Sequence, residues 1–192
     1  MPLFPGIFAS AISGHLTPAD AGSYFPLGEF TLSATQSSIT FDNIPQIYKH
    51  LELRSIAKDT AQPSGAFNLR ARFNGDSTNN YTLHRLFGAG SGSAASDAYT
   101  SQSSTVVGNV APNGYTNVYG VGVCQILDYT STNKYKTVRT LTGADVNGAD
   151  GYVFFISGVW LKSPIEAITS ITLFTDATAL ATNSSFALYG VL

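Results

Sequence analysis

Charged side chains are scarce in this chain of 192 residues, since Lys, Arg, Asp and Glu together make up 11% of it, against about a quarter in an average soluble protein. Ten basic and twelve acidic residues leave a formal net charge of −2. No basic run is present that could neutralise a row of phosphates, so we expect no nucleic-acid binding. A surface with few charged side chains causes little electrostatic repulsion between copies of the chain, which favours a protein that packs against neighbours in an assembly.

Cysteine and histidine are also rare. The single cysteine, Cys124, cannot form an internal disulfide, and its apolar surroundings in the sequence predict a small buried hydrophobe. His15, His50 and His84 stand far apart, and none has a nucleophile, a base or a second ligand at the spacing that hydrolysis or a zinc site requires. We therefore predict no catalytic residue, no metal site, no cofactor and no enzymatic activity.

Two kinds of targeting signal are missing as well. The first sixteen residues are apolar but contain no Lys or Arg ahead of the apolar stretch, which a secretory signal would have. No apolar run reaches the length of a membrane-spanning helix. We expect a protein that is made in a cytoplasm, has no membrane partner and leaves the cell only inside something larger.

What the chain does contain is apolar residues, 44% of the total, arranged in short segments. From about residue 30 these segments alternate apolar and polar positions and are separated by Gly, Asn, Ser and Pro, which predicts strands, and no segment has a helical period. The predicted strands cover residues 39–41, 50–58, 66–73, 81–87, 118–129, 135–142, 152–161, 168–174 and 185–191. Their unequal connections favour an all-β fold, an antiparallel β-sandwich of the jelly-roll type.

Three local features refine this prediction. The turn signal at Asn74 and Gly75 predicts that residues 66–73 and 81–87 form a hairpin. Residues 152–161 are apolar on both faces, which predicts a central strand covered on both sides, one side by another subunit. Residues 88–104 are nearly free of apolar side chains and are interpreted as a flexible surface loop.

The N-terminal residues differ from the rest. Residues 1–29 are interpreted as an irregular arm and residues 30–192 as a single sandwich domain. Leu3, Phe4, Ile7 and Phe8 are set among Pro and Gly residues, and an apolar arm outside the strand pattern must bury itself somewhere. Two alternatives remain open: a strap across the chain's own sandwich, or docking on a neighbouring subunit. The four residues are the candidate partner-binding residues.

Weaker signals point to ligands. Residues 145–150 resemble part of a calcium loop but lack the acidic residue that closes it. Tyr99, Tyr115 and Tyr119 are suited to stacking on sugar rings or to anchoring a protein interface.

Several motifs resemble a family of small virion proteins encoded by tailed bacteriophages, especially those of cyanobacteria and marine bacteria. The motifs are SITF at 38–41, IP at 44–45, YKHLELR at 48–54, RFNGD at 72–76, NY at 80–81, ITSITL at 168–173 and ALYGV at 187–191. The opening FPGIF at 4–8 is similar to the start of such proteins and implies a whole short gene product.

The resemblance implies a β-sandwich structural protein of the virion and carries over no catalytic residue. A compact domain suits a capsid decoration, or cement, protein that binds and stabilises the major capsid lattice as a homo-oligomer. The partners would then be the major capsid protein or other virion subunits. The alternative is a tail-tip or fibre-associated module that binds receptors or glycans.

Overall fold

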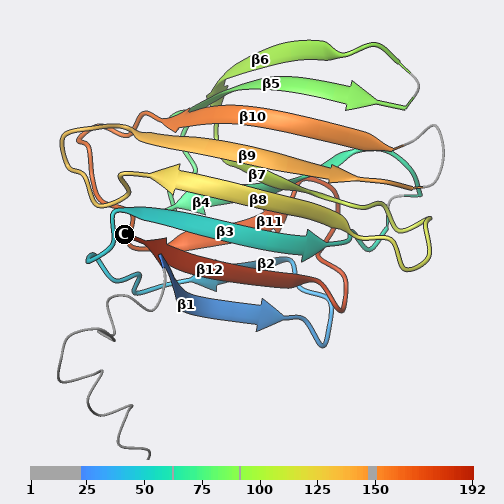
Figure 1. The fold of residues 1–192 in the computed structure, drawn as a ribbon, viewed down its shortest axis with the longest axis horizontal. Helices are drawn as coiled ribbons and strands as arrows, with labels where there is room; N and C mark the ends of the chain where they lie inside the picture. The colour runs from blue at the N-terminus through green and yellow to red at the C-terminus, as the bar shows by residue number, and fades with distance from the viewer. Residues whose placement is uncertain (1–22, 62, 91, 147–150) are drawn as a thin grey trace, which may run out of the picture.

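The structure is a computed structural model that describes residues 23–61, 63–90, 92–146 and 151–192. The described residues contain β-strands and no helix, and every pair of named strands is antiparallel (Figure 1). The strands form two sheets, one of eight and one of four strands. The prediction of an all-β, antiparallel β-sandwich is confirmed.

The larger sheet is the broad layer in front in Figure 1. Its strands, in spatial order, are β1 (Tyr24–Thr31), β12 (Ser185–Val191), β3 (His50–Ala57), β8 (Gly120–Leu127), β9 (Lys136–Ala144), β10 (Tyr152–Trp160), β5 (Tyr81–Ala89) and β6 (Ala95–Gln102). The smaller sheet lies behind it and contains β2 (Ser38–Phe41), β11 (Ile171–Thr175), β4 (Phe67–Phe73) and β7 (Thr105–Val110).

Alternation along the strands sends one set of side chains between the two sheets. The largest buried group is aromatic: Trp160 packs edge-on against Phe73, with ring centroids 5.5 Å apart, and stacks on Tyr81 at 6.2 Å. The indole Nε1 of Trp160 donates a hydrogen bond to the Asp76 carboxylate at 2.8 Å. Strands of both sheets are thereby tied together at one point of the core.

All nine predicted strands are present, and three further strands were not predicted: β1, β6 and β7. β1 crosses the predicted boundary between arm and domain, so residues 24–29 belong to the sandwich. The candidate partner-binding residues Leu3, Phe4, Ile7 and Phe8 lie outside the described residues.

The predicted hairpin of residues 66–73 and 81–87 is wrong. Asn74 and Gly75 do turn the chain, with φ angles of 52° and 69°, but β4 pairs with β11 and β7, whereas β5 pairs with β10 and β6. The turn therefore carries the chain from one sheet to the other. The buried Tyr81 fixes this crossing, because its hydroxyl accepts a hydrogen bond from the Phe73 amide at 3.0 Å.

The predicted flexible loop at 88–104 is also wrong over most of its length, since β6 occupies eight of these seventeen residues and the end of β5 two more. Backbone pairing with β5 and an ion pair between Arg85 and Asp97 hold the strand in place. A strand held by its backbone and by an ion pair needs no apolar side chains, because neither of its faces packs into the core.

Candidate functional site

The outer face of the eight-stranded sheet carries a set of large apolar side chains that contribute nothing to the core between the sheets. We call this set the outer patch; its members have between 42% and 59% of their surface exposed. They are Ile56 on β3, Val121 and Val123 on β8, Leu141 on β9, Val153 and Phe155 on β10, and Leu86 on β5. The five strands are neighbours in the sheet (Figure 1), and their exposed apolar side chains form one surface.

The strand register makes the outer patch continuous. Val123 lies opposite Leu141, and Leu141 lies opposite Phe155, which in turn lies opposite Leu86. In antiparallel pairs, directly opposite side chains stand about 5 Å apart, so these four side chains form an unbroken row. Ile56 and Val121 are partners in a second row beside it.

A hollow of about 1210 Å³ opens over the second row. Gly143 lies between Val121 and Val153, and Gly88 lies opposite Val153 on the far side. Because glycine has no side chain, the backbone at Gly143 and Gly88 forms the floor of the hollow. The apolar side chains beside these two glycines form its walls. A shape of this kind can receive apolar side chains of a second molecule.

One long side of the outer patch is bounded by a polar row. Gln125, Arg139, Ser157 and His84 lie opposite one another in turn across β8, β9, β10 and β5. Arg139 is exposed, and its side chain makes no ion pair within the described part of the chain. The border of the apolar surface therefore presents a positive charge.

Near β1, the same face carries an arginine held between two tyrosines. The Arg54 guanidinium lies 5.3 Å from the Tyr24 ring centroid and 4.9 Å from that of Tyr189. Its Nε donates to the buried carboxylate of Glu52 at 3.0 Å, and this hydrogen bond raises the pKa of Arg54. Arginine and tyrosine are the residue types that contribute most at protein interfaces, and here they adjoin the outer patch.

The two described histidines, His50 and His84, lie on different strands, β3 and β5. His50 Nδ1 accepts a hydrogen bond from the Asp128 backbone amide at 3.0 Å, and its contact with the Asp128 carboxylate is longer, at 3.8 Å. That carboxylate is instead bonded to the Lys134 ammonium at 2.9 Å, which holds the pKa of Asp128 below its usual value. His84 is exposed in the polar row of β5.

The remaining candidate residues are dispersed or undescribed. Tyr99 is on β6, whereas the Tyr119 hydroxyl donates to the Thr182 carbonyl at 3.2 Å and the ring lines the hollow. The calcium-loop candidate at 145–150 includes residues 147–150, which lie outside the described part. Among the described residues, no three His, Cys, Asp or Glu side chains are grouped to hold a metal ion, and no helix is long and apolar enough to cross a membrane.

Cys124 is fully buried on the inner face of β8, as its sequence context predicted. Burial raises the pKa of its thiol to about 12. The thiol is therefore a packing group of the core.

The sequence indicated part of the outer patch. The apolar character of residues 152–161 on both faces identified Val153 and Phe155, but Ile56, Leu86 and Leu141 were missed. A similar signal was present for Val121 and Val123, because residues 120–124 of the predicted strand 118–129 are small or apolar at every position and therefore on both faces. No protein-family model matches the chain, and no curated protein is significantly similar to it.

Proposed function

We propose that the protein is a non-enzymatic structural protein of a bacteriophage virion that packs the outer face of its eight-stranded sheet against another virion subunit. The observation that carries this proposal is the outer patch, seven large apolar side chains exposed together on one face. A contiguous apolar surface with a polar border is typical of a protein-binding site.

The partner that we propose is the major capsid protein, and the role is that of a decoration, or cement, protein. The resemblance of several sequence motifs to those of phage virion proteins supports this choice. The complementary surface would insert apolar side chains into the hollow and place an acidic residue against Arg139, which has no ion-pair partner within the described part of the chain. Each large side chain buried in this way contributes roughly 1.5 to 3 kcal/mol before ordering costs are subtracted.

Under this proposal the candidate partner-binding residues Leu3, Phe4, Ile7 and Phe8 provide a second attachment on a neighbouring subunit. The protein needs no cofactor, metal, nucleic acid or membrane for this role. It would be made in the host bacterial cytoplasm and would reside in the virion.

We also propose that the sandwich is a jelly roll extended by two hairpins. β1 pairs with β12, β2 with β11, β3 with β8 and β4 with β7, which is a nested order. Consecutive strands of this set change sheets, except that β4 and β7 share the smaller sheet. The hairpins β5–β6 and β9–β10 are inserted into this order, and both lengthen the same sheet. The insertions carry Leu141, Phe155 and Leu86, which are three of the four residues in the outer patch's longest row.

A second candidate function, a tail-tip or fibre-associated module that binds host glycans, is favoured by one group of residues. Tyr99 is 41% exposed, and its hydroxyl contacts both Arg85 and Asp97, at 3.0 and 3.1 Å. An exposed ring beside planar charged groups suits a sugar.

A particle reconstruction at side-chain resolution tests the two functions against each other. The first proposal predicts density for this chain on the capsid, with the outer patch covered by the major capsid protein. Density at the tail tip, with Tyr99 facing outward, would support the glycan-binding module instead. A bare outer face on the capsid would contradict the proposed mode of attachment.

A further inference from the structure

We propose that two copies of the chain associate by antiparallel pairing of their β6 strands, which joins the two eight-stranded sheets across a two-fold axis. Among the strands of the described residues, β6 is the last at one edge of its sheet and pairs with β5 alone. The backbone groups on its other side are available to a further strand, and the partner that fits them is a second β6.

The edge strands of the described sandwich differ in how open they are. β1 contains Pro26, which has no amide hydrogen to donate, and its pairing shifts register between Pro26 and Gly28. β2 has four residues, and all six residues of β7 are buried. Short length, proline, bulges and cover are the usual devices that stop an edge from pairing.

β6 has none of these devices over residues 95–99, and its pairing with β5 shifts register only beyond Tyr99, where Ser101 has a φ angle of 56°. It is eight residues long, contains no Pro, Lys or Arg, and is exposed along most of its length on both faces. Its single charged residue, Asp97, is neutralised within the chain, because Arg85 donates to both of its carboxylate oxygens, at 2.8 and 2.5 Å. Two β6 strands can therefore approach without repulsion between like charges.

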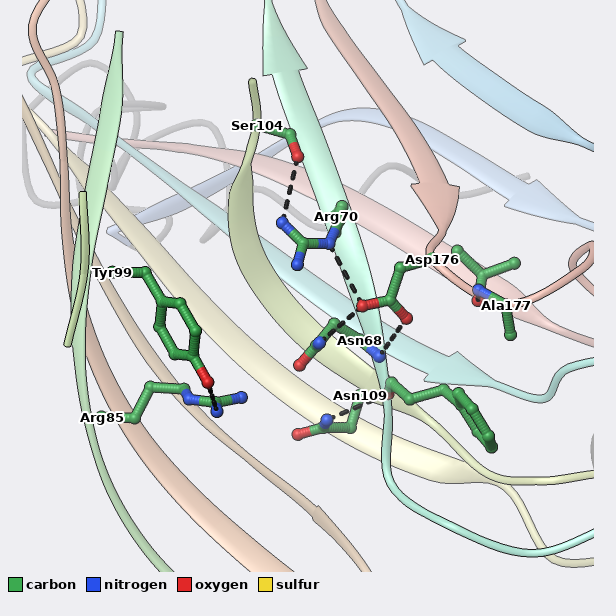
Figure 2. A network of polar contacts seen from close by, with 10 residues as sticks. Asn68, Arg70, Arg85, Tyr99, Ser104, Asn109, Asp176 and Ala177 are labelled. Atoms are coloured by element: carbon green, nitrogen blue, oxygen red, sulfur yellow. Dashed lines mark hydrogen bonds and ion pairs between the residues drawn. The ribbon is translucent and has the colours of Figure 1, made fainter. Parts of the chain in front are cut away.

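Side-chain hydrogen bonds also fix the position of β6. Arg85 Nη2 donates to the Tyr99 hydroxyl at 3.0 Å (Figure 2). Just beyond the strand, Arg70 of the smaller sheet donates to the Ser104 hydroxyl at 3.2 Å, and Arg70 is itself bonded to Asp176 (Figure 2). A strand fixed at its middle and at its end loses little further freedom when a partner binds.

The sequence of β6 is compatible with itself in one register. If the two-fold axis passes through Ala98, Asp97 lies opposite Tyr99 of the second copy and Ser96 lies opposite Thr100. This register places no two carboxylates together. Within one chain the Tyr99 hydroxyl donates to the Asp97 carboxylate at 3.1 Å, and across the axis each Asp97 faces Tyr99 of the second copy. It also brings Leu86 of both copies to the same side, so that two outer patches form one surface.

Disulfide trapping tests the strand and the register together. Ala98→Cys places two thiols across the axis, and Cys124 does not compete because it is buried. We expect rapid oxidation to a dimer. Thr100→Cys is the matched control on the same face of β6: its two copies would be offset by roughly 13 Å along the strand, too far for a disulfide. Dimer formation at Thr100 that equals or exceeds that at Ala98 would overturn the proposal.

Sedimentation provides an independent measurement. The wild-type protein should have twice the 20.3 kDa mass of one chain, and Ala98→Lys should dissociate it by placing two lysines opposite each other. Thr31→Lys, on the other edge of the sheet, should leave the dimer intact. A wild-type monomer, or an Ala98→Lys dimer, would overturn this inference while leaving the proposed binding of the outer patch untouched, because that binding is measured separately on capsids.

Discussion

Leu141 of β9 and Phe155 of β10 lie directly opposite each other on the outer face of the sheet, with 59% and 51% of their surfaces exposed. The inner face of the same two strands already packs into the core through Val138, Phe154 and Ile156. The outer pair is therefore not needed to hold the sandwich together, and its apolar surface is available for a partner.

The hollow can be filled without disturbing the fold. A Cβ atom at Gly88 meets only Val153, at 4.0 Å, so Gly88→Val should fold with a free energy of unfolding within about 0.5 kcal/mol of wild type. The new side chain takes up space that the partner needs, and overpacking costs about 1 to 3 kcal/mol. Capsid binding should weaken at least about tenfold, which corresponds to about 1.4 kcal/mol. Unchanged binding, measured by co-sedimentation, would show that the hollow is not used.

The other glycine of the floor gives a contrasting result. A Cβ at Gly143 would lie 2.4 Å from the Tyr152 carbonyl oxygen, a backbone atom that cannot move aside cheaply. Gly143→Ala should therefore lower the midpoint of thermal unfolding, whereas Gly88→Val should not. Equal melting temperatures of the two variants would contradict this difference between the sites.

Asp76 is predicted to make the fold sensitive to acid. Burial opposes ionisation of its carboxyl, but hydrogen bonds from Thr78, Asn80 and Trp160 outweigh burial and hold its pKa well below the usual range. Asp76→Asn should lower the free energy of unfolding at pH 7 by about 1.5 to 3 kcal/mol, the contribution of hydrogen bonds to a charged group. Urea denaturation measures the difference.

The direction of the pH dependence follows from the lowered pKa. The stabilisation is complete above the unfolded-state pKa of about 3.9 and is lost as the pH falls below it toward the folded-state pKa. Between pH 4 and pH 2 the wild type should therefore lose more stability than Asp76→Asn. Parallel losses in the two proteins would argue against an ionised Asp76 in the fold.

Cys124 should be inert in the native protein. Thiol reagents react with the thiolate, and burial both raises the pKa of this thiol to about 12 and blocks access to it. A coloured disulfide reagent should label one thiol per chain in denaturant and almost none in its absence. Rapid labelling of the folded protein would mean that the core opens at β8.

Deletion of residues 1–16 tests the arm that carries Leu3, Phe4, Ile7 and Phe8. β1 begins at Tyr24, so the shortened chain should keep its circular dichroism spectrum and a cooperative unfolding transition. Its affinity for particles that lack the protein should fall. If it binds as tightly as the full chain, or fails to fold, the arm is a strap across its own sandwich.

Alternation predicted strands only where one face is buried and the other is wet. β4 has this pattern, whereas β7 is buried on both faces and β6 is exposed on both, so neither shows a period of two. In β1 the register shift after Pro26 breaks the alternation. These three strands were missed for physical reasons that lie in their tertiary surroundings.

The outer patch was predictable only in part for a related reason. Val153 and Phe155 belong to a strand that is apolar on both faces, which sequence alone can show. Leu141 follows the polar positions Arg139 and Thr140, and its place in an apolar row depends on Val123 and Phe155 of neighbouring strands. Strand order, which the sequence pattern does not contain, brings the row together.

Leu141→Arg tests whether the outer patch attaches the protein to the capsid. The residue is exposed, so the variant should fold as the wild type does, and the charge at the centre of the row should be costly to bury against an apolar partner. Thr40→Arg, on the exposed face of the smaller sheet, is the matched control. In titrations of purified capsids that lack the protein, we expect wild-type affinity for Thr40→Arg and at least a hundredfold weaker binding for Leu141→Arg, equivalent to about 2.8 kcal/mol. Equal affinities for the two variants would contradict attachment through the outer patch.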